Sequence, residues 1–275
     1  MKLVFFSKTF KDKSIPDLVD AAHEFGFEGY DLCVRPGYAV NPENATSALP
    51  EAVKRLAADG FSVEMVTAPG DLVSPDHPWV EPLLGAMGES GIRLLKLGYA
   101  HFDPAREDYR QRVSEVRHAL SLWEKLGERY GVKICYHTHS GMCLGLNCAA
   151  LMHLVDGFDP KHIGAYIDPA HMLLNGEPFA FGVGMVREYL AIVALKDVLV
   201  SREPSGDEGK RRTRWVPAGE GCVPWSEVFA ELARVGFDGP LTIHAEYQAE
   251  TPEEHRAKLK PEVEYFRKKR DACAA

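Results

Sequence analysis

The chain has 275 residues, of which 45% are hydrophobic and 26% are charged, and its formal net charge at pH 7 is −8. This length suits one α/β barrel, for which about 250 residues is typical, and the composition is ordinary for a soluble globular protein. The acidic balance disfavours sequence-independent nucleic-acid binding, because such binding relies on Lys and Arg to neutralise phosphates.

Secretion and membrane insertion are also disfavoured. No apolar stretch approaches the roughly 20 residues of a membrane-spanning helix, and the apolar run at the N-terminus is too short for a signal peptide. The six cysteines form no Cys-x-x-Cys pair, and Cys33 and Cys135 lie within apolar segments, where Cys acts as a small hydrophobe. We therefore expect a reduced, cytoplasmic protein that binds neither nucleic acid nor membrane.

One junction recurs along the chain: a helical segment ends in glycine, and a short apolar segment follows at once. It occurs at Gly26, Gly60, Gly91, Gly131 and Gly236. Glycine after the last helical turn can adopt the left-handed conformation that ends a helix, and the apolar run suits a strand buried on both faces. The repetition predicts an alternating α/β chain.

Taken in order, the pattern predicts eight strands and eight helices. The strands are expected near residues 2–6, 28–33, 61–67, 92–98, 132–138, 162–168, 190–197 and 239–245. The helices are expected near 15–25, 43–59, 77–90, 107–130, 146–156, 179–189, 224–235 and 252–270. Eight such units favour a closed (β/α)8 TIM barrel as a single domain over residues 1–275. An open doubly wound sheet is disfavoured, since no glycine-rich dinucleotide fingerprint follows the first strand.

The segment 201–219 is expected to be the longest loop. It follows the seventh strand, at the rim where TIM barrels carry their sites, so it could cover a site there. Its basic run, Lys210 to Arg214, is interpreted as solvated, with a contact to an anionic substrate or a neighbouring subunit as alternatives.

Ionisable side chains stand where the predicted strands end. They are Lys96, His137, Asp168, Lys196 and His244, with His139, His171 and Glu246 two or three positions further along. Since the ends of parallel barrel strands open on one rim, we expect these groups to share one pocket. His137 and His139 point to the same side of a strand and could both ligate a metal.

Each of these residues also has a simpler interpretation. The histidines could be satisfied polar groups on loops, and Asp168 could cap the turn that follows it. Lys196 could form a salt bridge with Asp197 that braces the barrel mouth. Arg35 and Lys96 could hold an anionic or hydroxyl-rich substrate, or could merely balance Asp31 and other carboxylates.

Several phrases of the sequence together resemble one family over nearly the whole chain. They are Gly-Phe-Glu-Gly-Tyr-Asp-Leu at 26–32, Gly-Val-Lys-Ile at 131–134, Asp168-x-x-His171, Lys196-Asp197, Pro-Ala-Gly-Glu-Gly at 217–221 and Gly-Pro-Leu-Thr-Ile at 239–243. The chain resembles the xylose isomerase-like TIM barrels, the sugar phosphate isomerase/epimerase group that also includes apurinic endonuclease family 2.

This resemblance implies one divalent metal cation, Mn, Zn, Mg or Fe. The family holds it with Glu on strand five, Asp on six, His on seven and Glu on eight. Here Asp168 matches, His137 and His244 replace the two glutamates, and Ala194 stands where the strand-seven His would be. The expected metal ligands are therefore His137, Asp168 and His244. The phrase Tyr136-His137-Thr138-His139 also resembles the inosose dehydratase branch.

The resemblance implies a sugar isomerase or epimerase that removes a proton next to the carbonyl of a ketose or related polyol derivative. Glu246 or His171 is expected to act as the base and Lys196 to steady the oxyanion. Arg35, Lys96 and His139 are expected to bind the small-molecule carbohydrate. A keto-sugar or keto-inositol dehydratase is one alternative, and a non-catalytic sugar-binding barrel that has lost its metal is another. A nuclease acting at abasic DNA is the least favoured, and the sequence leaves a homo-oligomer possible.

Overall fold

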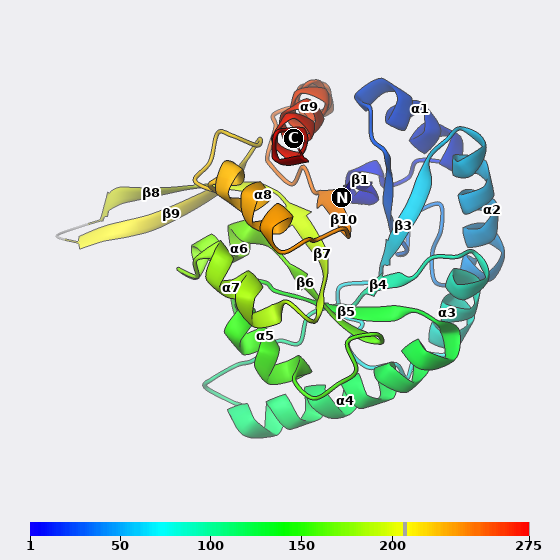
Figure 1. The fold of residues 1–275 in the computed structure, drawn as a ribbon, viewed down its shortest axis with the longest axis horizontal. Helices are drawn as coiled ribbons and strands as arrows, with labels where there is room; N and C mark the ends of the chain where they lie inside the picture. The colour runs from blue at the N-terminus through cyan, green and yellow to red at the C-terminus, as the bar shows by residue number, and fades with distance from the viewer. Residues whose placement is uncertain (206–207, 275) are drawn as a thin grey trace.

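Eight parallel strands close into a barrel, and helices follow the strands and surround it (Figure 1). The computed structural model describes residues 1–205 and 208–274. Around the barrel the strand order is β1, β10, β7, β6, β5, β4, β3 and β2, with β2 returning to pair with β1. The expected TIM barrel is confirmed.

The barrel strands are β1 (Lys2–Phe6), β2 (Gly29–Cys33), β3 (Ser62–Thr67), β4 (Leu94–Lys96), β5 (Lys133–His137), β6 (Ile163–Ile167), β7 (Leu190–Leu195) and β10 (Pro240–Ile243). The α-helices are α1 (Ile15–Phe25), α2 (Ala45–Ala58), α3 (Val80–Glu89), α4 (Tyr109–Tyr130), α5 (Cys148–Val155), α6 (Pro169–Leu174), α7 (Phe179–Val186), α8 (Trp225–Arg234) and α9 (Pro252–Ala274), and η1 (Ser7–Phe10) is a 3₁₀ helix. The expected helix near 179–189 is α7, and the short α6 directly after β6 was not anticipated.

Local sequence explains where the helices begin and end. Ser14 and Asp17 form a capping box at the start of α1, and the Asp108 side chain accepts the backbone N–H of Gln111 at the start of α4. Both helices end at a glycine with a left-handed backbone, Gly26 at φ 79° and Gly131 at φ 65°. The helix–glycine–strand junction is therefore a true structural repeat of this chain.

The barrel has two separate apolar cores. The larger lies between the strands and the surrounding helices and includes Trp123, Phe229 and Phe266. The smaller lies inside the barrel, where Met65, Cys135, Tyr166, Ala191, Ile192 and Ala194 pack together. The ionisable groups at the strand ends cap this inner cluster, because alternate residues of each strand point into the barrel.

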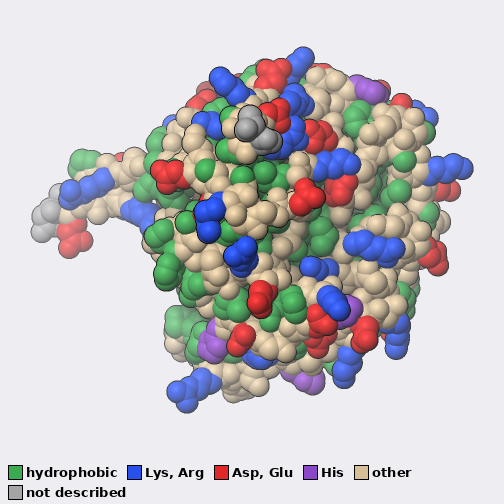
Figure 2. Space-filling view, in the orientation of Figure 1, with side chains coloured by type: hydrophobic (Ala, Val, Ile, Leu, Met, Phe, Trp, Pro, Cys, Tyr) green, Lys and Arg blue, Asp and Glu red, His purple; other side chains and the backbone are tan. Residues whose placement is uncertain are grey.

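The segment after β7 is an antiparallel hairpin, so the expectation of a loop at 201–219 was wrong. Strand β8 (Asp197–Ser205) pairs with β9 (Glu208–Val216), from Asp197 opposite Val216 to Ser205 opposite Glu208; residues 206 and 207 lie outside the described part. The hairpin projects from the body as an arm that carries Lys and Arg side chains (Figure 2).

The hairpin escaped the sequence pattern because its outer half has no buried face. Lys210 to Arg214 are all exposed, as expected for a solvated run. Backbone pairing and ion pairs such as Arg212 Nε to Glu203 Oε2 at 2.6 Å hold the arm, in place of apolar alternation. Within the part of the chain that is described, no helix combines the length and hydropathy needed to cross a bilayer.

Candidate active site

The ionisable residues predicted at the strand ends do meet at one end of the barrel. Lys96, His137, Asp168, His171, Lys196 and His244 are all at most 5% exposed. They come from or directly follow β4, β5, β6, β7 and β10, and they are brought together because parallel strands all end at the same rim. We call this buried group, with the half-buried His139 and Glu246, the mouth cluster.

Asp168 has two functions in the structure, one for each oxygen. Its Oδ1 accepts the backbone N–H groups of Ala170 (2.9 Å) and His171 (3.1 Å), so it caps α6. Its Oδ2 faces the mouth, 3.2 Å from Lys196 Nζ, 3.8 Å from His171 Nε2 and 3.9 Å from His137 Nε2. The capping interpretation is therefore confirmed, and the second oxygen faces the mouth, where the predicted role in a site would place it. Burial raises the pKa of Asp168, but the charge of Lys196 and the hydrogen bond from the His171 backbone N–H outweigh it, and the net pKa is lowered.

Lys196 joins two carboxylates. Its Nζ lies 3.2 Å from Asp168 Oδ2 and 3.1 Å from Glu246 Oε2, and the indole of Trp215 covers it at 4.7 Å. Burial lowers the pKa of Lys196, but the two carboxylates more than offset this, and the net pKa is raised. Glu246 also contacts Lys8, and burial of its carboxyl is outweighed by Lys196, so its pKa is held well below the usual range.

Asp197 takes no part in the mouth cluster, so the suggested Lys196–Asp197 salt bridge is not formed. Successive side chains of an extended strand point to opposite sides. Asp197 Oδ2 accepts the indole N–H of Trp225 (3.0 Å) and the backbone N–H of Gly219 (2.9 Å) behind the barrel wall.

Hydrogen bonds indicate which nitrogen of His139 and of His171 carries the proton. His171 Nδ1 accepts the backbone N–H of Ser140 (3.2 Å), so its proton lies on Nε2, which points to Asp168. His139 Nδ1 lies 2.8 Å from the carbonyl oxygen of Ser140 and donates to it, so its Nε2 keeps a lone pair. Burial lowers the pKa of His139 to about 4 and that of His171 to about 2, so both rings are neutral.

His244 makes one ring hydrogen bond and one longer contact to a carboxylate. Its Nε2 lies 2.6 Å from the hydroxyl of Tyr166, and its Nδ1 lies 3.5 Å from Glu246 Oε2. The Tyr166 hydroxyl donates to Nε2, which directs the Nδ1–H towards the carboxylate.

Three aromatic residues of the mouth were missed by sequence reasoning. Tyr166 precedes Asp168 by two positions and so points to the same side of β6, which was a usable signal. Tyr99 places its hydroxyl 3.2 Å from His137 Nδ1, and Trp215 packs on His171 with ring centroids 5.2 Å apart. Tyr99 lies beyond a strand end and Trp215 in the unexpected hairpin, so neither could be placed in advance.

Lys96, within the mouth cluster, and Arg35 have no carboxylate within 4 Å among the described residues. Arg35 Nε donates to the Ala68 carbonyl (3.0 Å), and Lys96 Nζ donates to the Leu97 carbonyl (3.1 Å) and lies 4.2 Å from the Tyr99 ring. Burial, assisted by Arg35, lowers the pKa of Lys96 to about 7.

Asp31 does not pair with either cation. It accepts hydrogen bonds from the hydroxyls of Thr67 (2.6 Å) and Thr242 (3.1 Å) inside the barrel. The balancing role suggested for Arg35 and Lys96 is therefore not formed as a direct ion pair with Asp31.

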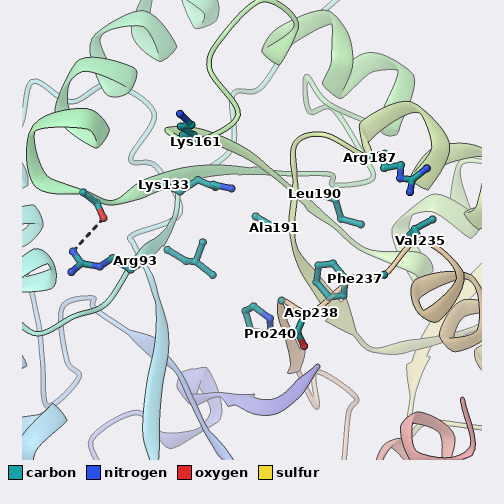
Figure 3. Close-up of a pocket in the computed structure, with 14 residues that line it drawn as sticks. Arg93, Lys133, Lys161, Arg187, Leu190, Ala191, Val235, Phe237, Asp238 and Pro240 are labelled. Carbon is teal, nitrogen blue, oxygen red and sulfur yellow. Dashed lines mark hydrogen bonds between the residues drawn. The ribbon is translucent and has the colours of Figure 1, made fainter. Parts of the chain in front are cut away.

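A different hollow lies at the opposite, N-terminal end of the strands (Figure 3). It has a volume of about 580 Å3 and is bordered by Arg93, Lys133, Lys161 and Arg187 together with apolar residues such as Phe237. Three of these cations are exposed and Lys133 is half-buried. In TIM barrels this end serves stability and the C-terminal end carries the chemistry, so we assign the candidate site to the mouth cluster.

The fold is a TIM barrel, and its buried ionisable groups gather at the C-terminal rim. The chain belongs to the xylose isomerase-like TIM barrel family, whose family model matches residues 19–269. It is 25% identical over 166 residues to an inosose dehydratase of Geobacillus kaustophilus, an alignment that covers 54% of this chain and 53% of that protein. The chain thus spans about half the length of the curated relatives it matches.

Solved structures share the whole fold. The apo 3-keto-D-glucoside 4-epimerase of E. coli superposes with a TM-score of 0.76 at 16% identity, covering 98% of this chain and 99% of that chain. The IolI protein with a bound zinc atom superposes with a TM-score of 0.73 at 14% identity, covering 100% and 98%. At such identities the likeness establishes the fold.

The zinc of that neighbour makes a divalent metal plausible in the family, but the donors here do not fit one. The described residues contain no group of three or more His, Cys, Asp or Glu side chains arranged to hold a metal ion. Of the three expected ligands, His137 and Asp168 approach each other, whereas the hydroxyl of Tyr166 occupies Nε2 of His244 and leaves only its Nδ1 without a hydrogen bond. A neutral His that binds metal donates its other N–H, yet His171 Nδ1 accepts one.

Proposed function

We propose that this chain catalyses proton abstraction next to the carbonyl of a small ketose or related polyol derivative, as a sugar isomerase or epimerase. The proposal rests on a set of buried polar atoms in the mouth cluster whose hydrogen-bonding capacity is not satisfied. Asp168 Oδ2, His137 Nε2, His171 Nε2 and His244 Nδ1 are buried and have no hydrogen-bond partner within the described residues, and Asp168 Oδ2 is met only by the ion pair with Lys196. Unpaired buried polar atoms that converge on one point are costly, and a bound hydroxyl or carbonyl group would satisfy them.

Lys196 and His171 supply the positive and hydrogen-bonding groups that an enolate oxygen needs. Removal of a proton next to a carbonyl places negative charge on the carbonyl oxygen, and donors already fixed in a buried site stabilise that charge. Lys196 is charged because two carboxylates surround it, and His171 presents a neutral N–H. In this proposal His171 donates a hydrogen bond to the substrate oxygen, and it is no longer the expected base.

Glu246 and His139 are the two groups able to carry the proton. Glu246 is an ionised carboxylate, and His139 is a neutral imidazole whose Nε2 lone pair is free. They follow β10 and β5, which are separated in the barrel by β7 and β6. Two carriers on separate sides suit epimerisation, in which the proton leaves one face and returns to the other.

Arg35 and Lys96 would bind the far end of the substrate. Both are cations without a carboxylate within 4 Å among the described residues, and both lie beside the aromatic rings of the mouth. A substrate that carries a carboxylate, a phosphate or several hydroxyl groups would pair with them.

A dehydratase is the second candidate, because the curated relatives are inosose dehydratases. The two reactions share their first step. Loss of a neighbouring hydroxyl after proton removal requires a group that donates a proton to it, and His171 Nε2–H or Lys196 would be placed to do so.

Hydrogen–deuterium exchange tests the shared step. We expect incubation with keto-sugars and keto-inositols in D2O to replace the hydrogen next to the carbonyl, observed by NMR, and the Asp168→Asn variant to lose this exchange. The product then distinguishes the two reactions, because epimerisation gives a new stereoisomer and dehydration gives an unsaturated ketone. Binding of such compounds without any exchange would favour a non-catalytic sugar-binding barrel.

A further inference from the structure

We infer that the Lys196 ammonium is the built-in cation of this site and stands in place of a divalent metal, so that proton abstraction proceeds without one. The inference rests on the proposed function, and it makes a separate claim about which cation the site contains. Four observations about the mouth cluster support it.

The first is the position of the ammonium. Lys196 Nζ lies between the two carboxylates of the mouth, 3.2 Å from Asp168 Oδ2 and 3.1 Å from Glu246 Oε2, and the side chain is 5% exposed. An acidic pair buried at a barrel mouth needs a counter-cation. Lys196 provides one that cannot dissociate.

The second is the space beneath it. Ala194 precedes Lys196 by two positions on β7 and faces the barrel interior, where it packs in the inner core with Tyr166. An imidazole at position 194 would compete for this space with the Tyr166 ring. The small side chain of Ala194, where the family has a His ligand, thus leaves room for the ring of Tyr166 on β6.

The third is the state of the histidines. The Ser140 N–H donates to His171 Nδ1, which leaves the proton on Nε2, and Tyr166 occupies His244 Nε2. Ligation by His171 Nδ1 or His244 Nε2 would require breaking a hydrogen bond already made to the surrounding protein, and ligation by His171 Nε2 would require its proton to leave that nitrogen.

The fourth is electrostatic. A metal bound to Asp168 Oδ2 at its usual distance would lie within about 5 Å of the Lys196 ammonium. Two cations at that separation in a buried site repel strongly, so the ammonium opposes metal binding as well as replacing it.

Metal titration of the full-length chain tests the inference independently of turnover. After chelator treatment, the wild-type chain, Lys196→Met and Lys96→Met are titrated with MnCl2 and with ZnCl2 by calorimetry. Lys96→Met is the matched control, because it removes a buried amine from the same mouth, one that lies against the Tyr99 ring and has no carboxylate within 4 Å in the described part of the chain. We expect Lys196→Met to bind metal at least tenfold more tightly than the wild type, and Lys96→Met to resemble the wild type.

The exchange reaction supplies the second readout. We expect chelator to leave deuterium exchange by the wild type unchanged within twofold, Lys196→Met to lose it at least a hundredfold, and added Mn2+ to restore part of it in that variant alone. Stoichiometric micromolar metal binding by the wild type, equal affinities in all three proteins, or exchange that chelator abolishes and metal restores would each overturn the inference. If no substrate exchanges at all, the proposed function fails, while the titrations still decide which cation the site accepts.

Discussion

The two ends of the barrel both gather positive side chains, but they do so in opposite ways. At the N-terminal end, Arg93, Lys161 and Arg187 stand in water around an open hollow of about 580 Å3. At the C-terminal end, Lys96 and Lys196 are at most 5% exposed. The open hollow is thus the less reactive end, because solvent screens exposed charges, whereas burial shifts pKa values and strengthens each interaction.

The strongest test of this contrast is to remove the charge of Asp168 while keeping its shape. Asp168→Asn can retain the cap on α6 through its remaining side-chain oxygen, but it removes the negative charge that faces Lys196. We expect exchange or turnover to fall by about 10²–10⁴-fold, typical for loss of an electrostatic catalytic group, with little change in melting temperature.

Asp168→Ala is the companion to that variant. It also deletes the cap, so it should cost about 1 kcal/mol of stability in addition to the lost activity. Full activity in Asp168→Asn, checked by steady-state kinetics, would remove the mouth cluster from the mechanism.

A buried carboxyl on α9 gives the next largest effect, on stability. Glu262 is 3% exposed, accepts the backbone N–H of Ala218 at 3.2 Å, and burial raises its pKa to about 8. The native state therefore holds a proton that the unfolded chain has released once the pH is above its ordinary pKa of 4.5. Stability from this group should be lost as the pH rises from about 5 to about 8.

The Glu262→Gln variant should abolish that dependence. An amide stays neutral, so the variant should be more stable than the wild type by on the order of 2 kcal/mol near pH 8 and nearly equal to it near pH 5. Urea unfolding at both pH values measures the difference. Equal stabilisation at both would show that burial of the charge is not the cause.

Removing one hydroxyl from the mouth should have a smaller effect. Tyr166→Phe deletes the 2.6 Å hydrogen bond to His244 Nε2 and leaves the ring packed in the inner core. The His244 ring then loses its only ring hydrogen bond, so we expect turnover to fall about tenfold, as for the loss of a positioning group. Unchanged turnover in steady-state kinetics would exclude a role for this pair in orienting His244.

The smallest effect is expected at the opposite end of the barrel. Lys133→Gln and Arg187→Gln each remove one cation from the open hollow (Figure 3). Surface charges contribute little to stability, and this end lies away from the C-terminal ends of the strands. Activity should therefore stay within about twofold of the wild type. A large loss in either variant would contradict the assignment of function to the mouth.

Periodicity was sufficient to predict the barrel, because the glycine junctions and apolar runs repeat with every unit. The meeting of Lys96, His137, Asp168, Lys196 and His244 followed from the topology alone. The proton positions did not follow, since they depend on the Ser140 backbone and on Tyr166, which only the folded chain brings into contact with the histidines.

The hairpin and the Lys196 bridge were also not predicted, because each depends on contacts that form only in the folded chain. The hairpin of β8 and β9 is formed by backbone pairing between polar strands, so no apolar pattern announced it. The bridging of Asp168 and Glu246 by Lys196 depends on side-chain reach across the mouth, which residue spacing does not encode.

The separation of the two apolar cores has a consequence for how such proteins diverge. The larger core, which contains Trp123 and Phe266, packs the helices against the sheet. The ionisable groups of the mouth cluster instead contact the smaller inner core around Met65 and Tyr166. Single substitutions during evolution can therefore replace a metal ligand, an amine or a phenol side chain next to the inner core while the barrel itself is retained.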